Sequence, residues 1–353
     1  MRVLVLLGGS SAEREVSLDS GRAVLDALAA KGHEAIAYDP GRKNFPLRKA
    51  AAGGPVPGDP DPGLSWGAAL ASVVEPLRSR IDVVFIALHG GAGEDGAVQA
   101  VLESLGVPYT GSGPLASGIA MDKRVTKILF EAGELATPPW RLWDPGSDLV
   151  EADALPVVDP LGGWPVVVKP VAEGSSVGVS IVGGFDGLPA AIRAVRKATG
   201  VPAGDLLVER FIPGREIAVG ILGSRPLPPI EIIPKEGFYD YTRKYTPGAS
   251  EYVIPAAVPA QVLRALEQIG WRAFRCLGCR GFGRVDLRLD PEGRPFLLEV
   301  NTIPGMTATS LLPKAAKEEG LSFPELIEEI CRLAVESPRP VPDGPHAPSQ
   351  ETR

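Results

Sequence analysis

The sequence has few cysteines, few histidines and no long hydrophobic run. Its 353 residues include only three cysteines and three histidines, and the odd thiol count argues against a disulfide framework. Cys276 and Cys279 form a C-x-x-C pair without a second pair, so we interpret them as packing residues at a helix end. The start, MRVLVLLGGS, is too short for a signal-peptide core, and no apolar run could span a membrane. We therefore expect a cytoplasmic protein without membrane contact.

Positive charge is also scarce, with 36 basic against 43 acidic residues and a net charge of −7. This balance argues against binding of long nucleic acids, although a local basic pocket for a small anion remains compatible with it.

Glycine and proline are abundant, together about 22% of the chain where average usage gives roughly 12%. They gather at 40–67, at 144–163 and after 337, where we expect mobile, turn-rich surface and a disordered tail.

The first 120 or so residues alternate between apolar strands and helices. Strands are expected at Val3–Leu7, His33–Asp39 and Asp82–His89, which predicts an open, parallel α/β sheet with ligands at the strand carboxyl ends. Shorter strands follow between 165 and 234, then a polar loop at 235–251, a helix near 262–276 and a hairpin. The chain is long enough for two or three domains.

The hairpin formed by Arg284–Asp290 and Pro295–Asn301 places Asp286 across from Glu299. Two facing carboxylates repel, and a divalent cation reverses the sign of that interaction. Asp, Glu and an Asn carbonyl are also the oxygen ligands that Mg²⁺ accepts, with nucleotide phosphates completing its shell. A solvated polar face, neutralised by neighbouring arginines, is an equally weighted alternative.

Two further segments have the features of a nucleotide site. Lys169 ends an apolar strand and is followed by a Gly/Ser-rich turn at 173–178, which offers an ammonium and backbone N–H groups to phosphates. No GK[ST] ends this turn, so it is not a Walker A loop. The extended segment Leu206–Ile212, followed by Glu216, can pair its backbone with adenine and a carboxylate with ribose. The alternatives are a flexible hairpin with a surface lysine and an ordinary buried strand.

Three loops could bring backbone close to a ligand. Gly8-Gly9 follows the first strand, but G-x-G-x-x-G is absent, so the dinucleotide fingerprint fails. His89 ends the third predicted strand, where it is either functional or a structural histidine. The amide of Gly305, in TIPGMT, could face an oxyanion or belong to a plain turn.

Taken in order, eight segments resemble the motifs of the D-alanine–D-alanine ligases of the ATP-grasp superfamily: GGSSAEREVSL, ALHGGAGEDGAVQ, LGVPYTGSG, MDKRVTK, VVVKPVAEGSSVGV, FYDYTRKY, GFGRVDLRLD and LLEVNTIPGMTATSLLPKAA. The resemblance covers about residues 1–335. It implies an α/β fold with an N-terminal open parallel preATP-grasp domain (1–121), followed by a central ATP-grasp lobe (122–214) and a C-terminal lobe with the metal site (215–336). The tail, 337–353, is expected to be disordered.

The resemblance also implies a reaction, in which ATP phosphorylates one D-alanine and a second D-alanine displaces the phosphate, giving D-alanyl-D-alanine for peptidoglycan synthesis. It assigns the nucleotide to seven residues: Lys123, Lys169, Lys244, Glu209, Phe211, Ile212 and Glu216. It assigns two Mg²⁺ (or Mn²⁺) ions to three residues: Asp286, Glu299 and Asn301. It assigns the substrates and the intermediates to six: Glu13, His89, Arg284, Gly305, Ser310 and Leu311.

In such ligases a mobile loop closes over the site, and here Glu13, Ser175 and Tyr245 would tie the 235–251 loop down. Tyr245 favours dipeptide over ester formation, because depsipeptide-forming relatives tend to lack it. The family suggests a homodimer. The alternatives are another ATP-grasp ligase with different amino-acid specificity, a nicotinamide-binding Rossmann protein, and a non-catalytic binding module.

Overall fold

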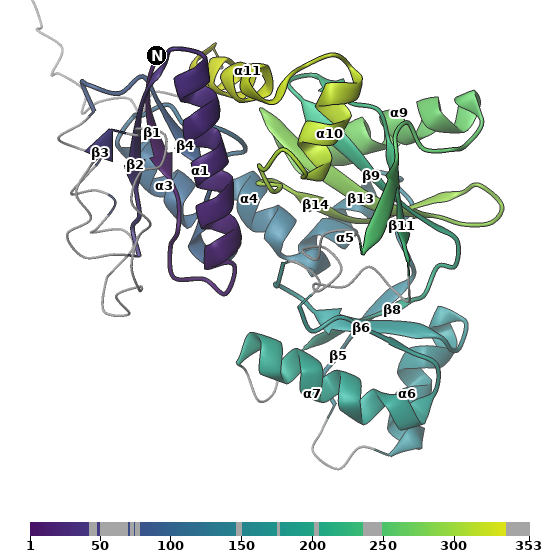
Figure 1. The fold of residues 1–353 in the computed structure, drawn as a ribbon. Helices are drawn as coiled ribbons and strands as arrows, with labels where there is room; N and C mark the ends of the chain where they lie inside the picture. The colour runs from purple at the N-terminus through teal and green to yellow at the C-terminus, as the bar shows by residue number, and fades with distance from the viewer. Residues whose placement is uncertain are drawn as a thin grey trace, which may run out of the picture.

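The computed structural model describes residues 1–41, 48–49, 70, 74, 78–145, 150–174, 177–200, 205–235 and 249–336. Within these ranges the chain forms three sheets with helices packed around them (Figure 1). The predictions for the tail at 337–353 and for most of 40–67 lie outside the described residues. No helix in the described ranges is long and apolar enough to cross a membrane.

The N-terminal sheet has the order β3-β2-β1-β4, and its strands are β1 (Arg2–Leu6), β2 (Glu34–Tyr38), β3 (Arg48–Lys49) and β4 (Val83–Ile86). β1 pairs in parallel with both β2 and β4, which confirms the predicted open parallel sheet, while the two-residue β3 is antiparallel. Val3 to Leu6 are fully buried because helices cover both faces, as the unbroken apolar run predicts. The helices of this part are α1 (Arg14–Ala30), α3 (Ala97–Ser104) and α4 (Pro114–Met121).

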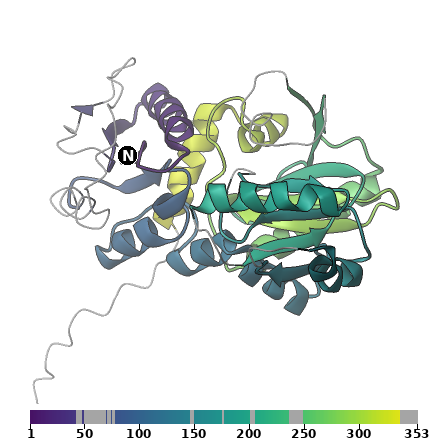
Figure 2. The ribbon, with the colours of Figure 1, turned by 90° about the horizontal axis from the view of Figure 1, so that it is seen from below.

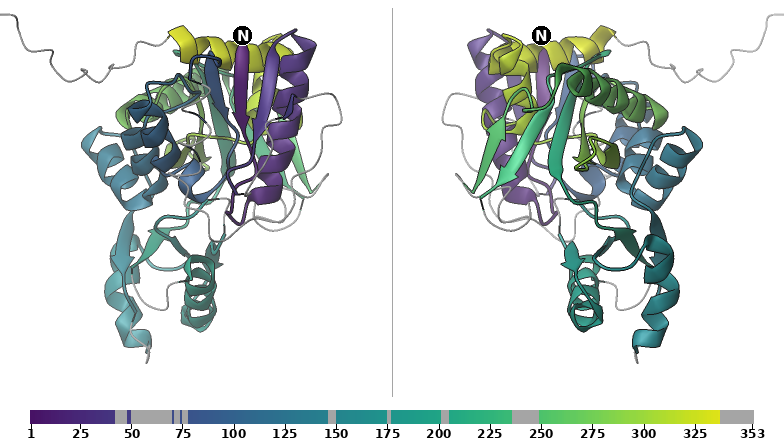
Figure 3. Two further views of the ribbon diagram at one scale, coloured as in Figure 1. Left: turned by 90° about the vertical axis from the view of Figure 1, so that its left-hand side faces the viewer. Right: turned by 90° about the vertical axis from the view of Figure 1, so that its right-hand side faces the viewer.

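The central sheet is antiparallel, in the order β5-β8-β6-β7, and its strands are β5 (Trp140–Trp143), β6 (Val166–Pro170), β7 (Ser180–Val182) and β8 (Leu206–Arg210). Its outer face is covered by α6 (Glu151–Val158) and α7 (Leu188–Thr199), and Figure 2 shows α7 lying across it. In both side views the sheet and its two helices project below the rest of the molecule (Figure 3).

The prediction of a turn-rich surface at 144–163 is wrong for most of that segment. Residues 151–158 form α6 and 159–161 a short 3₁₀ helix, although Pro156 lies inside α6. Ala154, Val158 and Leu161 are buried against the central sheet. Burial of these apolar side chains outweighs the local turn propensity of glycine and proline, so this segment belongs to the core of its lobe.

The third sheet has the order β12-β11-β9-β13-β14, with β10 beside β9, and its strands are β9 (Arg215–Leu222), β10 (Arg225–Pro226), β11 (Ile230–Pro234), β12 (Ser250–Val253), β13 (Phe282–Leu289) and β14 (Pro295–Asn301). One face packs against α9 (Ala260–Cys276) and α5 (Lys123–Ala132). The other face packs against α10 (Leu311–Glu318), and α11 (Phe323–Glu336) joins it to α1 in a core shared with the N-terminal sheet (Figure 1).

The strands of the three sheets follow one another along the chain without interleaving. We therefore propose domain divisions at 121/122 and 214/215. The shared core means that the first and third units are packed as one body, while the central sheet has a core of its own.

The hairpin of β13 and β14 pairs Asp286 directly with Glu299, as the sequence predicts. A bulge after this pair shifts the register, so that Leu287 faces Leu297. Consequently Leu297 and Val300 enter the core, and Leu298 turns toward the same cleft as Glu299. Strict alternation, which places Leu298 with Val300 on the apolar face and Leu297 on the face of Glu299, is therefore wrong at these two positions.

Candidate active site

A cleft that is partly open to solvent lies between the central sheet and the third sheet. Strands β6 and β8 line one wall, and β13 and β14 line the other. Most of the residues predicted to hold a nucleotide and metal border it: Lys123, Lys169, Glu209, Phe211, Ile212, Glu216, Asp286 and Glu299. The structure thus brings together candidates that are up to 176 positions apart in the sequence.

A buried carboxylate with two lysines occupies the β6–β8 wall. Glu209 is 3% exposed and accepts a hydrogen bond from Lys169 Nζ at 2.6 Å, while Lys127 Nζ lies 2.8 Å from its other oxygen. Burial by itself raises the pKa of Glu209, but the two ammonium groups outweigh it and lower the pKa. The side chain of Glu209 is therefore an anion that holds Lys169 at the cleft.

The segment between β8 and β9 forms a second part of the cleft wall. Arg288 on β13 holds it, donating to the carbonyls of Ile212 at 2.9 Å and Gly214 at 2.8 Å and lying 5.3 Å from the Phe211 ring centre. Its guanidinium also approaches the Glu216 carboxylate at 3.4 Å. Burial lowers the pKa of Arg288, with Glu216 opposing this, and the contacts keep the extended backbone in place.

The paired carboxylates on β13 and β14 are each balanced by a cation. Arg284 binds Asp286 through two nitrogens, both at 2.7 Å, and Lys123 Nζ lies 3.4 Å from Glu299 and donates to the Glu173 carbonyl at 2.5 Å. No group of three or more His, Cys, Asp or Glu side chains is arranged to hold a metal within the described ranges. Any metal here would therefore need oxygens from Asn301 and from a substrate in addition to the two carboxylates.

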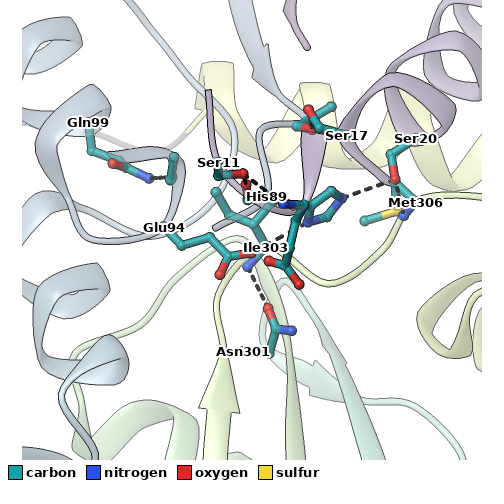
Figure 4. A network of polar contacts seen from close by, with 12 residues as sticks. Ser11, Ser17, Ser20, His89, Glu94, Gln99, Asn301, Ile303 and Met306 are labelled. Atoms are coloured by element: carbon teal, nitrogen blue, oxygen red, sulfur yellow. Dashed lines mark hydrogen bonds and ion pairs between the residues drawn. The ribbon is translucent and has the colours of Figure 1, made fainter. Parts of the chain in front are cut away.

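His89 lies at the carboxyl edge of the N-terminal sheet in a hydrogen-bonded network (Figure 4). Its Nε2 lies 3.0 Å from Ser20 Oγ, which accepts from the backbone N–H of Met306 at 3.2 Å. Its Nδ1 lies 3.4 Å from Glu94 Oε1, and its carbonyl accepts from Ser11 Oγ at 2.5 Å. The histidine is 5% exposed. Through these hydrogen bonds it links the first βα loop to the segment that follows β14.

Glu13 is buried at the start of α1 and faces the same region. A Cβ added to Gly90 would lie 3.1 Å from Glu13 Oε2, and one added to Gly174 would lie 3.7 Å from Oε2 of both Glu13 and Glu94. The loop after β6 therefore meets the N-terminal domain at these carboxylates. Glycine at both positions leaves the space beside Glu13 open.

The turn after β14 leads into α10. Asn301 Oδ1 accepts from the Ile303 amide at 3.0 Å, and Ser310 Oγ accepts from the Thr307 amide at 3.2 Å. A Cβ added to Gly305 would lie 3.0 Å from Ser310 Oγ, and Leu311 is the first residue of α10. The turn is therefore fixed by side chains at both ends, and Gly305, Ser310 and Leu311 lie close together.

Comparison with known proteins shows the family of the chain. A family model described as "D-ala D-ala ligase C-terminus" matches residues 129–332, and one described as "D-ala D-ala ligase N-terminus" matches residues 2–112. The chain belongs to the D-alanine–D-alanine ligase family. Because the matches span both halves of the chain, they favour this family over a nicotinamide-binding Rossmann protein.

Relatives and solved structures extend the comparison over nearly the whole chain. A D-alanine–D-alanine ligase of Geobacter sulfurreducens is 46% identical, with 93% of this chain and 92% of the relative covered. One from Synechococcus sp. (strain JA-2-3B'a(2-13)) is 42% identical, with 95% and 94% covered. The crystal structure of the Bacillus anthracis ligase complexed with ATP matches with a TM-score of 0.73 and 32% identity, over 95% of this chain and 97% of that one. The fold is thus that of an ATP-grasp ligase.

Three residues assigned through the family resemblance, Ser175, Lys244 and Tyr245, lie outside the described residues. Two charged side chains, those of Lys127 and Arg14, were not among the predicted residues. Lys127 follows Lys123, the lysine of MDK, by four positions. Residues at this spacing lie on one face of a helix, so the sequence indicates that Lys127 lies beside Lys123. Arg14 forms a 2.6 Å ion pair with Asp39 beneath the first loop, and no local pattern indicated that pair.

The C-x-x-C pair is a packing feature, as expected. Cys276 and Cys279 are free thiols, Cys276 Sγ donates to the Leu129 carbonyl at 3.3 Å, and burial raises the pKa of Cys279 to about 12. A thiol with so high a pKa is neutral at physiological pH, and therefore a poor metal ligand and nucleophile.

Proposed function

We propose that this protein joins two D-alanine molecules to D-alanyl-D-alanine, using ATP and passing through a D-alanyl phosphate. The observation that carries the proposal is the cleft, in a member of the D-alanine–D-alanine ligase family. In it Lys169 of the central sheet and Lys123 of α5 lie with the paired carboxylates of the third sheet. The alternative is an ATP-grasp ligase that joins other amino acids, and assays with different substrates distinguish the two functions.

The nucleotide would lie between the two sheets. Lys123, Lys169 and Lys244 would contact the phosphates. Of these, Lys123 and Lys169 border the cleft. The extended backbone at Phe211 and Ile212 offers edges for adenine. Two carboxylates complete the nucleotide set, Glu209 for adenine and Glu216 for the ribose hydroxyls. Arg288 would position this wall without contacting the nucleotide itself.

The residues present fit a magnesium or manganese site. Asp286 and Glu299 face each other in register, and Asp286 retains lone pairs beyond those bonded to Arg284. Asn301 would turn its amide oxygen from Ile303 to join them. Two ions held by these residues would supply positive charge that offsets the charge of the phosphates, so that an anionic carboxylate can approach.

The substrates would lie on the side of the N-terminal domain. The carboxylate of Glu13 would bind the ammonium of the first D-alanine, with His89 beside it held by Ser20 and Glu94. Ser310 and the amide of Leu311, at the N-terminus of α10, would seat the carboxylate of the second D-alanine.

The reaction then proceeds in two balanced steps. A carboxylate oxygen of the first D-alanine attacks the γ-phosphorus, forming an O–P bond as ADP leaves. The ammonium of the second D-alanine first releases a proton to solvent. Its free amine then attacks the acyl carbon, and as the C–N bond forms, phosphate leaves together with the second N–H proton. Arg284 and the amide of Gly305 would stabilise the negative charge of the phosphorylated and tetrahedral species. Glu13, Ser175 and Tyr245 would tie the loop that excludes water from the acyl phosphate.

The product is a building block of peptidoglycan, which assigns the protein to cell-wall biogenesis. We propose a cytoplasmic location, since the reaction draws on ATP, and a homodimer, the assembly that the family suggests. Neither nucleic acid nor membrane is required by the site.

A coupled assay tests the function. Purified protein with ATP, Mg²⁺ and D-alanine should release phosphate and form D-alanyl-D-alanine, whereas L-alanine should give neither. Assays across other D-amino acids and with D-lactate as second substrate separate the alternative ligases. Absence of phosphate release with D-alanine, in protein that still binds ATP, would refute the proposal.

A further inference from the structure

Lys127 is a buried cation with no role in the reaction outlined above. Its side chain is fully buried on α5, where lysine is rarely found without a charge partner. Its Nζ lies 2.8 Å from Glu209 Oε2 and donates to Thr137 Oγ1 at 2.6 Å and to the Pro138 carbonyl at 3.4 Å. The ammonium is therefore fixed on three sides within the protein.

Among the described residues, Glu209 lies between Lys127 and the cleft. Lys169 and Glu209 line the cleft, and Lys127 lies behind them against the second oxygen of Glu209. One carboxylate balances one ammonium, so the three side chains together carry a net charge of +1. Without Lys127 the net charge would be zero, because Glu209 would neutralise Lys169 alone.

The same lysine joins the two walls of the cleft. Thr137 accepts from Lys127 and donates to the Leu297 carbonyl at 2.8 Å, which is two positions before Glu299 on β14. Lys127 therefore connects Glu209 of the central sheet to the strand that carries a proposed metal ligand.

We propose that Lys127 is a positioning residue of the nucleotide site, which engages one oxygen of Glu209 so that Lys169 keeps positive charge available for the phosphates. The identity of the ligand as a nucleotide rests on the proposed function. The role of Lys127 is distinct from that of Lys169, because it acts through Glu209 and does not touch the ligand.

The burial of Lys127 makes this role sensitive to pH. Burial lowers the pKa of Lys127 to about 8, with Glu209 and Glu131 opposing the shift and Lys169 adding to it. As the pH rises through about 8, Lys127 loses its proton and the net charge of the three groups falls from +1 to zero. Affinity for ATP should therefore fall on the alkaline side of this value.

Kinetics and equilibrium binding of three variants test the proposal. Lys127→Met keeps the length of the side chain without its charge, Lys127→Arg keeps the charge, and Lys197→Met removes an exposed lysine on α7 as a control. We expect Lys127→Met to raise the KM and Kd for ATP about 10- to 100-fold, the equivalent of one lost charge-assisted hydrogen bond, and to leave the KM for D-alanine within about twofold. Lys127→Arg should retain most of the affinity, and Lys197→Met all of it.

The pH profile separates positioning from a merely structural role. In the wild type the Kd for ATP should rise through an inflection near pH 8, and this inflection should vanish in Lys127→Met. An unchanged Kd for ATP in Lys127→Met, or an equal rise for ATP and adenosine, would overturn the proposal. A flat wild-type profile would overturn it even if the variant does not fold. The binding arm needs no turnover, so a wild type that binds ATP but makes no dipeptide would refute the proposed function and leave this inference standing.

Discussion

Arg14 and Asp39 form an ion pair beneath the first loop. We expect its loss to lower the free energy of unfolding more than the loss of most other contacts in the N-terminal domain. Asp39 has no exposed surface and accepts from the amides of Gly9 and Gly41, both at 2.9 Å. Arg14, 11% exposed, approaches its other oxygen at 2.6 Å. The pair therefore closes the loop that precedes Glu13.

The substitution Asp39→Asn keeps the shape of the side chain but replaces one carboxylate oxygen with an NH2 group. If the amide oxygen stays on Gly9 and Gly41, the amide nitrogen faces the Arg14 guanidinium, donor against donor. Removing one partner of a buried ion pair costs about 3–5 kcal/mol, and we expect about 3 kcal/mol here because Arg14 still donates to the Gly9 carbonyl. The KM for D-alanine should also rise severalfold, since Glu13 is next in the chain to Arg14.

Urea denaturation followed by circular dichroism measures this loss of stability. The matched control is Asp82→Asn, since Asp82 pairs with Arg2 at 2.8 Å in the same sheet, with side chains 36% and 45% exposed. An exposed pair contributes at most about 1 kcal/mol. If Asp39→Asn is no more destabilising than Asp82→Asn, the reasoning about the buried pair is wrong.

Three further predictions concern the cleft and the thiols. Gly214→Ala should cost about 2 kcal/mol or more in thermal unfolding, because φ is +115° and the new Cβ would lie 2.2 Å from the Leu289 carbonyl oxygen; an unchanged melting temperature would contradict this. Arg288→Met should raise the KM for ATP severalfold and spare the KM for D-alanine, since its bonds to the β8–β9 segment are lost. A thiol reagent at pH 8 should label Cys276 first, while Cys279, buried with a pKa of about 12, should react only after unfolding, as mass spectrometry of the labelled peptides would show.

Much of the fold is predictable because its signals are local. Unbroken apolar runs identify β1 and β4, and alternation in the hairpin places Asp286 opposite Glu299, since side-chain direction in a strand follows from position alone. Where local signals compete with packing they fail. The turn propensity at 144–163 yields to burial of Ala154 and Val158, and a bulge overrides alternation at Leu298.

The candidate site, too, could be predicted only in part from the sequence. Sequence motifs supplied nearly all of its proposed members, among them Lys169, Glu209 and Asp286, which line one cleft in the structure. They could not indicate that Glu209 binds two lysines, because the second, Lys127, comes from a helix 82 positions earlier and is oriented by packing of α5 against the third sheet.

By itself, then, the sequence determined most of the strands and helices and the facing carboxylates, because each depends on periodicity or motifs over a few residues. The tertiary structure decided which charges share a buried space. Ser20 and Met306 are hydrogen-bonded although 286 positions apart, and Asp39 meets Arg14 only where two strands and a helix converge. Such contacts are set by how the sheets and helices pack, and burial, more than residue type, then fixes the charge and pKa of groups such as Lys127.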